Sequence, residues 1–417
     1  MTNKGYVIIG NGAAGISAVE ALRQEDDDTP ITIVSHESCL SYSKVLLHHY
    51  VDGEIDENGL FIRSEEFYRD LGIKLMLGVK ADTIDPDSHA VHLEDDSTIG
   101  FDRLLIATGS CPWIPSIRGI NDEATFTMWT LDDARRLHHT VRTGRNVVIV
   151  GGGFVGMHAL NAMVNCGLKV TVVDIADRIM PQSLDSQSTD LLRGHLEARG
   201  VGLFLGVKPT EIRDRGSEKA LILEDGREVR GDTMIVATGA TPNIGPAEKG
   251  PIARNIGLIV DDYMRTNYKE IYAAGDVAEV TDCLTGQKRI LGLWTAAVEQ
   301  GRIAGLNMAG KHTPYLGGIA MNSIDVLGLP VVTIGDTLLA EDSDGFSKIV
   351  YASKQSKIYR KFLFKEEALV GAILIGYSED AGIIRNIIKA QIKIGRSEGG
   401  FGFGSLRNRS HYLMYGG

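Results

Sequence analysis

The chain has 417 residues, of which 43% are apolar and 23% charged, and its net charge is −11. This composition is ordinary for a globular protein, and the length predicts two or three domains. The acidic charge argues against nucleic acid as a partner, and no apolar run approaches the roughly 18 residues that would predict a membrane span.

The N-terminal segment has the pattern of a dinucleotide-binding unit. A strand-like run at residues 6–9 leads into Gly10-Asn11-Gly12-Ala13-Ala14-Gly15, then into a helix-like run and a second strand at 31–34. Glycines let a pyrophosphate approach the backbone, and the helix start offers unpaired N–H groups. Glu37, after the second strand, is placed to accept hydrogen bonds from a ribose. Because the first strand follows Met1 so closely, we expect no cleaved signal peptide.

The same pattern returns at residues 147–174. A strand at 147–150 precedes Gly151-Gly152-Gly153-Phe154-Val155-Gly156, and Asp174 ends the next strand. An acid there favours NADH, because the 2′-phosphate of NADPH would meet a like charge. Arg178 could serve a 2′-phosphate, or it could pair with Asp174 or Asp177. We expect NADH.

Two such units in one chain are most useful as a flavin site paired with a nicotinamide site. A flavin accepts a hydride and returns single electrons, which a second nicotinamide cannot do. We therefore expect an α/β protein that binds FAD in the first unit and NAD(H) in the second.

Three further segments resemble those of the FAD-dependent pyridine nucleotide-disulfide oxidoreductases. Ala107-Thr108-Gly109 is similar to the motif where the family's chain leaves the flavin domain, and residues 234–243, with Gly239, are similar to the motif on its return. Residues 271–278, with Gly275 and Asp276, resemble the second flavin motif, whose Asp binds the ribityl chain and pyrophosphate region. The resemblance implies two Rossmann-like domains, with the NAD domain inserted in the FAD domain, and a C-terminal α+β domain.

Within the family, the likeness is greatest to rubredoxin reductases, to dioxygenase ferredoxin reductases and to the flavin domains of nitrite reductases. Tyr42-Ser43-Lys44 resembles a loop whose basic residue lies near the flavin, and residues 293–301, with Trp294, resemble a segment beside the isoalloxazine ring. Trp294 could also be a simple core residue. The resemblance implies catalytic roles for Lys44, Trp294 and His158.

The resemblance also implies two sets of cofactor-binding residues and no metal ligands. The FAD set is Gly10, Gly12, Ala14, Gly15, Glu37, Lys44, Ala81, Ala107, Thr108, Gly109, Gly275, Asp276 and Trp294. The NAD set is Gly151, Gly153, Phe154, Val155, Gly156, Asp174 and Gly239.

The four cysteines bear on the alternative of a thiol mechanism. They are far apart, with no CxxC pair, which predicts a reducing, cytoplasmic location and argues against a disulfide scaffold or a cysteine-ligated cluster. The CxxxxC of the family's disulfide reductases is absent, and Cys39 lies too early for the single reactive cysteine of its oxidases. Cys111 and Cys166 are predicted to be small core residues.

Three departures from the family pattern indicate a specialised subgroup. His158 stands where relatives carry a Glu near the nicotinamide, so it could alter hydride geometry or pH dependence, or it could be a packed histidine. Val45 replaces a Pro in the loop after Lys44, and Trp113 replaces an Arg.

The domain organisation follows from these motifs. We expect an FAD domain at 1–115 and 241–315, an NAD domain at 116–240, and an α+β interface domain at 316–394 with strands at 321–334, 348–351, 359–364 and 368–374 and a helix at 380–394. Residues 395–417 are glycine-rich and basic, which is typical of a solvated tail or of an arm that docks a partner.

The expected function is hydride transfer between NAD(H) and FAD, with electrons exchanged with an external acceptor. The acceptor is predicted to be an iron–sulfur protein, a rubredoxin or the iron–sulfur subunits of a complex, as in the FAD/NAD subunit of phenylglyoxylate dehydrogenase. A homo- or hetero-oligomer could form through the C-terminal domain. The alternatives are an NADH oxidase or thiol-type flavoenzyme, and a non-enzymatic flavin-binding interaction module.

Overall fold

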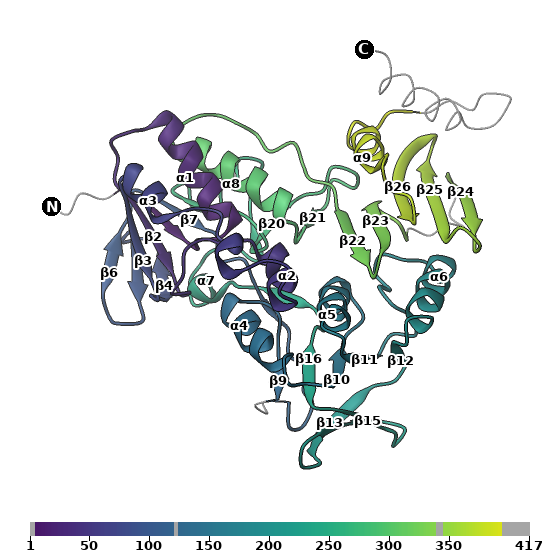
Figure 1. Ribbon diagram of the computed structural model, residues 1–417. Coiled ribbons are helices and arrows are strands. Elements are labelled where there is room, and N and C mark those ends of the chain that lie inside the picture. Colours follow the sequence, from purple (N-terminus) through teal and green to yellow (C-terminus); the bar gives the residue numbers. More distant parts are fainter. Residues whose placement is uncertain (1–4, 121–123, 339–344, 394–417) are drawn as a thin grey trace. The chain divides into compact units, whose positions relative to one another are not determined.

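The computed structural model describes residues 5–120, 124–338 and 345–393. It forms two compact units, one of Met1–Pro181 and Leu192–Gly318, the other of Gln182–Leu191 and Ile319–Gly417 (Figure 1). The expected tail at 395–417 lies outside the described residues. Within the described ranges, no helix is both long and apolar enough to cross a bilayer.

The first unit contains a parallel five-stranded sheet in the order β19-β7-β1-β2-β3. Its central strands β1 and β7 are almost entirely apolar and buried, which is the pattern of strands covered on both faces. The strand β19 joins this sheet after the whole second glycine unit has passed, so the second fold is an insertion in the first. The strands are β1 (Tyr6–Ile9), β2 (Ile31–Ser35), β3 (Ile73–Leu77), β7 (Arg103–Ile106) and β19 (Ile271–Ala273).

Two helices pack side by side on this sheet at unusually close range (Figure 1). They are α1 (Ala13–Glu25) and α8 (Trp294–Met308). A methyl group on Gly301 would stand 2.1 Å from the carbonyl oxygen of Ala14, and one on Gly305 would stand 2.4 Å from that of Ala18. Glycine at both positions therefore brings the two helix backbones into contact.

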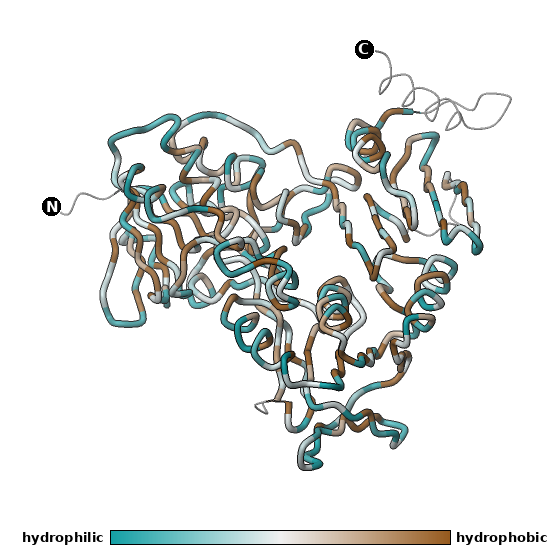
Figure 2. Tube along the Cα trace, in the orientation of Figure 1, coloured by the Kyte–Doolittle hydropathy of each residue, from teal (hydrophilic) through white to brown (hydrophobic). Residues whose placement is uncertain are grey.

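The inserted fold repeats the parallel arrangement in the order β12-β11-β10-β16-β9. Two short strands, β8 (Ser110–Pro112) and β17 (Ala240–Pro242), pair antiparallel where the chain leaves the first fold and returns to it. The sheet strands are β9 (Thr125–Phe126), β10 (Asn146–Val150), β11 (Lys169–Asp174), β12 (Gly202–Leu205) and β16 (Thr233–Val236). Hydrophobic residues concentrate along the strands of both folds, while loop tips are hydrophilic (Figure 2).

Smaller elements complete the first unit. One antiparallel sheet contains β4 (Ala81–Asp85), β5 (Ala90–Leu93) and β6 (Thr98–Gly100). A second antiparallel sheet contains β13 (Pro209–Asp214), β14 (Lys219–Leu223) and β15 (Glu228–Gly231). A mixed sheet holds β18 (Leu258–Ile259), β20 (Ala278–Thr281) and β21 (Lys288–Arg289). The remaining helices are η1 (Lys44–Leu46), α2 (Leu47–Val51), η2 (Glu57–Leu60), α3 (Glu65–Asp70), α4 (Leu131–Thr140), α5 (Phe154–Asn165) and α7 (Gly245–Glu248).

The second unit is an antiparallel five-stranded sheet in the order β22-β23-β26-β25-β24, covered by α9 (Ala381–Lys389). The strands are β22 (Met321–Val326), β23 (Leu329–Gly335), β24 (Phe346–Ser353), β25 (Ile358–Lys365) and β26 (Ala368–Ile375). The run expected at 321–334 is therefore two strands, because Leu327 and Gly328 both adopt positive φ and form a two-residue hairpin turn. The expected α/β class, with a C-terminal α+β domain, is confirmed.

The segment Gln182–Leu191 belongs to this second unit, a grouping that the sequence did not indicate. The ammonium group of Lys361, only 1% exposed, lies 3.2 Å from the Asp185 carboxylate, which also accepts a 2.7 Å hydrogen bond from the Tyr359 hydroxyl. The Thr337 hydroxyl donates to the carbonyl of Ser183. These contacts hold the start of α6 (Ser186–Glu197) on the antiparallel sheet.

The contact between α1 and α8 predicts the effect of adding one methyl group. Gly305→Ala should lower the thermal unfolding midpoint by several degrees, because its Cβ would meet a backbone oxygen at 2.4 Å and the overpacking should cost about 1–3 kcal/mol. Gly194→Ala in α6 is the control, since no described atom lies within 4 Å of its added Cβ. That variant should unfold at the same or a higher temperature. Equal midpoints for the two variants would contradict the packing argument.

Candidate functional site

Each parallel sheet ends in a turn that only glycine can form. Gly10 and Gly151 have φ values of +117° and +110°, in the region that side chains rarely adopt. A methyl group on Gly10 would stand 2.1 Å from the oxygen of Ala107, and one on Gly151 would stand 2.3 Å from that of Ala237. The first glycine of each turn therefore lies against the end of the neighbouring strand.

The other glycines of each turn divide into closed and open positions. Gly15 and Gly156 are closed, because an added Cβ would stand 2.1 and 2.0 Å from the carbonyl oxygens of Gly10 and Gly151, respectively. Gly12 and Gly153 are open, with no described atom within 4 Å of an added Cβ. They precede α1 and α5 and make no side-chain capping bond within the described chain. Free space beside uncapped N–H groups suits a pyrophosphate at both turns.

The two acids expected to contact ribose have different surroundings. Both oxygens of Asp174 accept backbone N–H groups, from Gly152 at 2.5 Å and Ala176 at 2.8 Å, so its carboxylate is fixed at the edge of the turn. Glu37 accepts a 2.7 Å hydrogen bond from Tyr42 and lies 3.4 Å from the ammonium group of Lys44. Glu37 and Lys44, which the resemblance associates with the ribose and the flavin ring, thus form one ion pair.

The second flavin motif is held by residues that sequence reasoning missed. The Ser110 hydroxyl donates a 2.7 Å hydrogen bond to Asp276, and the carbonyl of Ser110 accepts one of 2.7 Å from the Trp129 ring. The amide of Gln300, a buried side chain on α8, accepts the N–H of Gly275 at 2.8 Å. Gln300 lies between Glu299 and Gly301 in a segment that also carries Arg302, so neither it nor Ser110 gives a distinct sequence signal.

The remaining expected residues lie at or near the ends of several elements of the first unit. Ala107 continues β7 into the turn, the Thr108 hydroxyl donates to the carbonyl of Asn243, and Gly109 and Gly239 adopt positive φ. Ala14 is buried against α8, Ala81 begins β4, Phe154 and Val155 begin α5, and Trp294 begins α8 half-buried.

Two buried polar atoms of the first fold lack a partner among the described residues. These are the Asn11 amide nitrogen and the Ser41 hydroxyl. Tyr68 joins the two residues, because its hydroxyl donates to the amide oxygen of Asn11 and accepts the N–H of Ser41. Buried polar groups are nearly always satisfied in folded proteins, so these atoms fit a polar ligand in this fold.

One short stretch of the first fold, residues 42–57, makes several side-chain contacts to the inserted fold. The Tyr42 hydroxyl accepts the N–H of Leu131, the first residue of α4, at 3.0 Å. Arg135 of α4 forms a two-point pair with Glu57, with distances of 2.5 and 3.0 Å. The Asn165 amide, at the end of α5, donates to Asp52. The two glycine turns are therefore held in one compact body.

Three histidines gather where α2 meets α5. The ring centroids of His48 and His49 are 3.9 Å apart, and those of His48 and His158 are 4.4 Å apart. Burial, followed by the nearby His49, lowers the pKa of His48 to about 4. Burial, followed by the neighbouring His48, lowers the pKa of His158 to about 4. Both rings are therefore uncharged at neutral pH.

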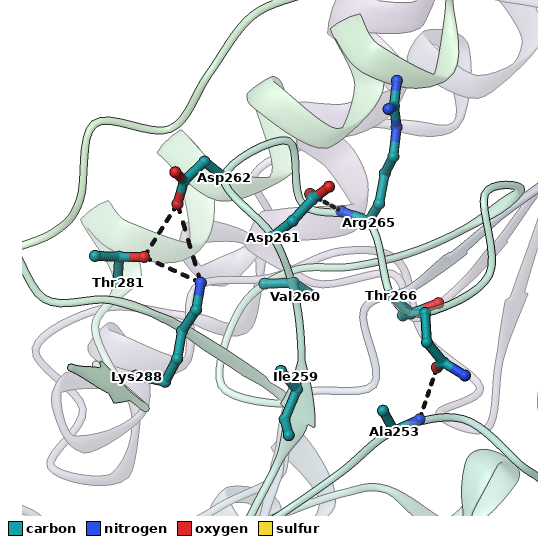
Figure 3. Close-up of a pocket in the computed structure, with 10 residues that line it drawn as sticks. Ala253, Ile259, Val260, Asp261, Asp262, Arg265, Thr266, Thr281 and Lys288 are labelled. Atoms are coloured by element: carbon teal, nitrogen blue, oxygen red, sulfur yellow. Dashed lines mark hydrogen bonds and ion pairs between the residues drawn. The ribbon is translucent and has the colours of Figure 1, made fainter. Parts of the chain in front are cut away.

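A possible metal-ligand group and a surface depression both fall outside the expected cofactor set. Ligand atoms of His49, Asp52 and Glu54 lie within 4.8 Å of one another, but the His49 ring already bonds Glu54 at 2.6 Å and Asp52 bonds Asn165. The depression, of about 500 Å³, is lined by residues of 253–267 and 281–288 and contains none of the expected residues. Figure 3 shows Lys288 there, bonded to Thr281 and 4.0 Å from Asp262.

The cysteines give little support to a thiol mechanism. Burial, followed by the negative charge of Glu37, raises the pKa of Cys39 to about 11. Burial also raises the pKa of Cys111 and of Cys166. Because the thiolate is the reactive form, these environments disfavour a nucleophilic cysteine.

Comparison with protein families matches two regions. Residues 4–301 match the family described as pyridine nucleotide-disulphide oxidoreductase, and residues 321–392 match the rubredoxin NAD+ reductase C-terminal domain. The first match contains both glycine turns and the Asp276 motif. The second covers the antiparallel sheet of the second unit.

Among curated proteins, the chain is 26% identical to the epsilon subunit of NADH-dependent phenylglyoxylate dehydrogenase from Aromatoleum evansii, over 92% of this chain and 91% of that protein. It is 29% identical to the rubredoxin-NAD(+) reductase of Pseudomonas putida, over 92% and 98%. The chain spans only about half the length of some other relatives, such as 46% of the Escherichia coli nitrite reductase (NADH) large subunit.

Among solved structures, the NAD-dependent persulfide reductase from A. fulgidus superposes with a TM-score of 0.87. It is 28% identical, and the superposition covers 93% of this chain and 77% of that one.

The lowered pKa values of His48 and His158 predict that the NMR signals of these two rings do not change with pH near neutrality. Signals of His48 and His158, identified by their loss in His48→Gln and His158→Gln, should not shift between pH 7 and pH 5.5, whereas a free histidine titrates near pH 6.5. The unfolded chain would take up protons on these rings around pH 6.5 and the folded chain only around pH 4. The free energy of unfolding should therefore fall as the pH drops through this window. Midpoints near 6.5 for both rings would contradict the burial argument.

Proposed function

Because the chain belongs to the pyridine nucleotide-disulphide oxidoreductase family, we propose that it is a reductase that passes electrons from NADH through FAD to an iron–sulfur protein. The family membership makes the chain an NADH-dependent flavin oxidoreductase whose cofactors are FAD and NAD(H). The observation that carries the proposal is the pair of turns, each open at its second glycine, within one compact unit. NADH supplies a hydride, and FAD releases the two electrons one at a time.

The first turn is the proposed FAD site. Gly12 leaves room for the pyrophosphate, and the Asn11 amide and Ser41 hydroxyl offer unpaired polar atoms in the same fold. Asp276, oriented by Ser110, is proposed to bind the ribityl and pyrophosphate region. Glu37 is proposed to bind the ribose.

The role proposed for Lys44 is modified by its ion pair. Because the ammonium group lies 3.4 Å from Glu37, we propose that Lys44 counters the pyrophosphate charge at the ribose end of FAD. Trp294 is proposed to lie beside the isoalloxazine ring, because it begins α8 half-buried and two turns of the same helix pack on α1.

The second turn is the proposed NADH site. Gly153 leaves room for the pyrophosphate, and the fixed carboxylate of Asp174 favours a ribose that carries free hydroxyls over one that carries a 2′-phosphate. Arg178 is 3.6 Å from Asp177, which supports its role as an ion-pair partner rather than a phosphate ligand.

The proposed acceptor is an iron–sulfur protein, a rubredoxin or a partner subunit that carries iron–sulfur clusters. Support comes from the match of residues 321–392 and from the names of the relatives. Each NADH supplies two electrons, so two one-electron acceptors are reduced per turnover. We further propose a cytoplasmic location and assembly through the C-terminal domain.

The two open glycines give a matched pair of variants. Gly12→Val should fold normally, because no described atom lies within 4 Å of an added Cβ, but should be purified without FAD. Gly153→Val should keep FAD but lose its reduction by NADH. Flavin content by absorbance and anaerobic stopped-flow reduction measure both effects. Normal FAD content in Gly12→Val, or unchanged NADH reduction in Gly153→Val, would remove the corresponding assignment.

The proposed electron acceptor can be tested by comparing iron proteins with oxygen as oxidants of the reduced protein. Under anaerobic conditions, rubredoxin or a ferredoxin should reoxidise the NADH-reduced protein much faster than dissolved oxygen does in a parallel aerobic mixture. Alkylation of the four cysteines should leave flavin reduction by NADH intact. Rapid oxygen consumption with no reduction of either iron protein would favour an NADH oxidase instead.

A further inference from the structure

The turn that leads into α4 of the inserted fold is organised by one carboxylate. One oxygen of Asp133 accepts a hydrogen bond from the Thr127 hydroxyl at 2.7 Å. The same oxygen accepts the N–H groups of Trp129 and Thr130, both at 3.1 Å. The Thr130 hydroxyl accepts the N–H of Asp133 in return, which completes a capping box at the start of α4. The shape of residues 127–131 therefore depends on Asp133.

The first contact of this turn with the FAD fold leads to Asp276. The ring N–H of Trp129 donates a 2.7 Å hydrogen bond to the carbonyl of Ser110. The hydroxyl of Ser110 donates one of 2.7 Å to Asp276, the acid proposed to bind the ribityl and pyrophosphate region. Trp129 therefore restrains the backbone of the residue that orients Asp276.

The second contact leads to Glu37, the acid proposed to bind the ribose. The N–H of Leu131 donates to the Tyr42 hydroxyl at 3.0 Å, and that hydroxyl donates to Glu37 at 2.7 Å. Burial, followed by the charge of Glu37, raises the pKa of the Tyr42 hydroxyl, which therefore keeps the proton it donates. Leu131 is the first residue of α4, so its N–H has no partner inside the helix and is free to make this contact.

Two acids of the proposed FAD site are thus held indirectly by one turn of the inserted fold. Residues behind a binding site can set its affinity without touching the ligand, because they fix the orientation of those that do. We propose, on the basis of the function above, that Asp133 is a positioning residue for FAD: the turn that it fixes keeps Asp276 and Glu37 in the orientation that binds the cofactor.

This arrangement makes FAD binding and the start of α4 interdependent. Coupling between two sites is reciprocal, so a turn that strengthens FAD binding is itself stabilised when FAD binds. FAD should therefore slow amide hydrogen exchange at residues 129–131 of the unmodified protein more than at β14, which lies in a separate sheet of the same fold. Equal slowing at the two segments would contradict the inference.

The main test measures FAD affinity in variants of the full chain. FAD is removed, and its rebinding is followed by the change in flavin fluorescence. In Trp129→Phe and Tyr42→Phe, which keep the ring and delete one polar contact, the Kd of FAD should rise about tenfold. Asp133→Ala should raise it about a hundredfold, because both contacts are weakened. The controls are Trp113→Phe, at a half-exposed tryptophan, and Asp132→Ala, at the exposed neighbouring carboxylate, and both should keep the original Kd.

Double variants separate positioning from a general loss of stability. Ser110→Ala deletes the hydroxyl through which Trp129 acts on Asp276, so adding Trp129→Phe to it should raise the FAD Kd less than about twofold. Trp129→Phe and Tyr42→Phe act on different acids, so their effects should multiply when they are combined. A purely structural role would weaken FAD binding by the same factor with or without Ser110→Ala.

Each outcome separates this inference from the proposed function. If the unmodified apoprotein does not bind FAD, the FAD site itself is wrong. If it does, but the three variants bind FAD as tightly as the two controls, the positioning inference is overturned and the FAD site stands. Should Asp133→Ala not fold, the two phenylalanine variants decide the question. An effect of Trp129→Phe that is undiminished in the Ser110→Ala background would assign the turn to the stability of the fold and overturn the inference as well.

Discussion

Backbone meets backbone at the carboxyl end of each parallel sheet, and this contact leaves no room for a single side-chain carbon. At Gly15 the nearest carbonyl oxygen, that of Gly10, would be 2.1 Å from an added Cβ, and the same approach recurs at Gly156. The open space beside Gly12 and Gly153 lies at the start of each helix, where the first backbone N–H groups have no intrahelical partner. The glycines of α8 extend the same principle, since Gly301 and Gly305 let that helix lie on α1 and carry Trp294 and Gln300 with it.

The parts of the protein that the sequence predicts are those governed by local geometry. Glycine spacing, the apolar strands and the acids Glu37 and Asp174 follow from rules that act over a few dozen residues. These features, together with the motifs at Thr108 and Asp276, were enough to predict the family, the α/β class and both cofactors. The hairpin turn at Leu327 was missed because a bulky residue at positive φ is rare and gives no sequence signal.

The features that could not be predicted from the sequence depend on contacts between residues that are far apart in the chain. Ser110 and Asp276 are 166 positions apart, and the pairing of Lys44 with Glu37 depends on how one loop folds back. His48 carried no motif and became noticeable only when α2 was seen against α5. The neutrality of the histidine pair is likewise a product of burial, which no local pattern encodes. Such contacts are made by tertiary packing, and single-sequence rules do not reach them.

The anchoring of Gln182–Leu191 on the antiparallel sheet constrains how the C-terminal domain could be exchanged between reductases of this family by recombination. Leu184 and Ser188 are fully buried, and Asp185 gives the interior Lys361 its counter-charge. A C-terminal domain transplanted alone would lose the carboxylate that lies 3.2 Å from its buried Lys361, unless the host supplied an equivalent acid. The modular unit is therefore discontinuous in the gene: recombination that respects the protein's physics must move the ten-residue segment and the distant C-terminal sheet together.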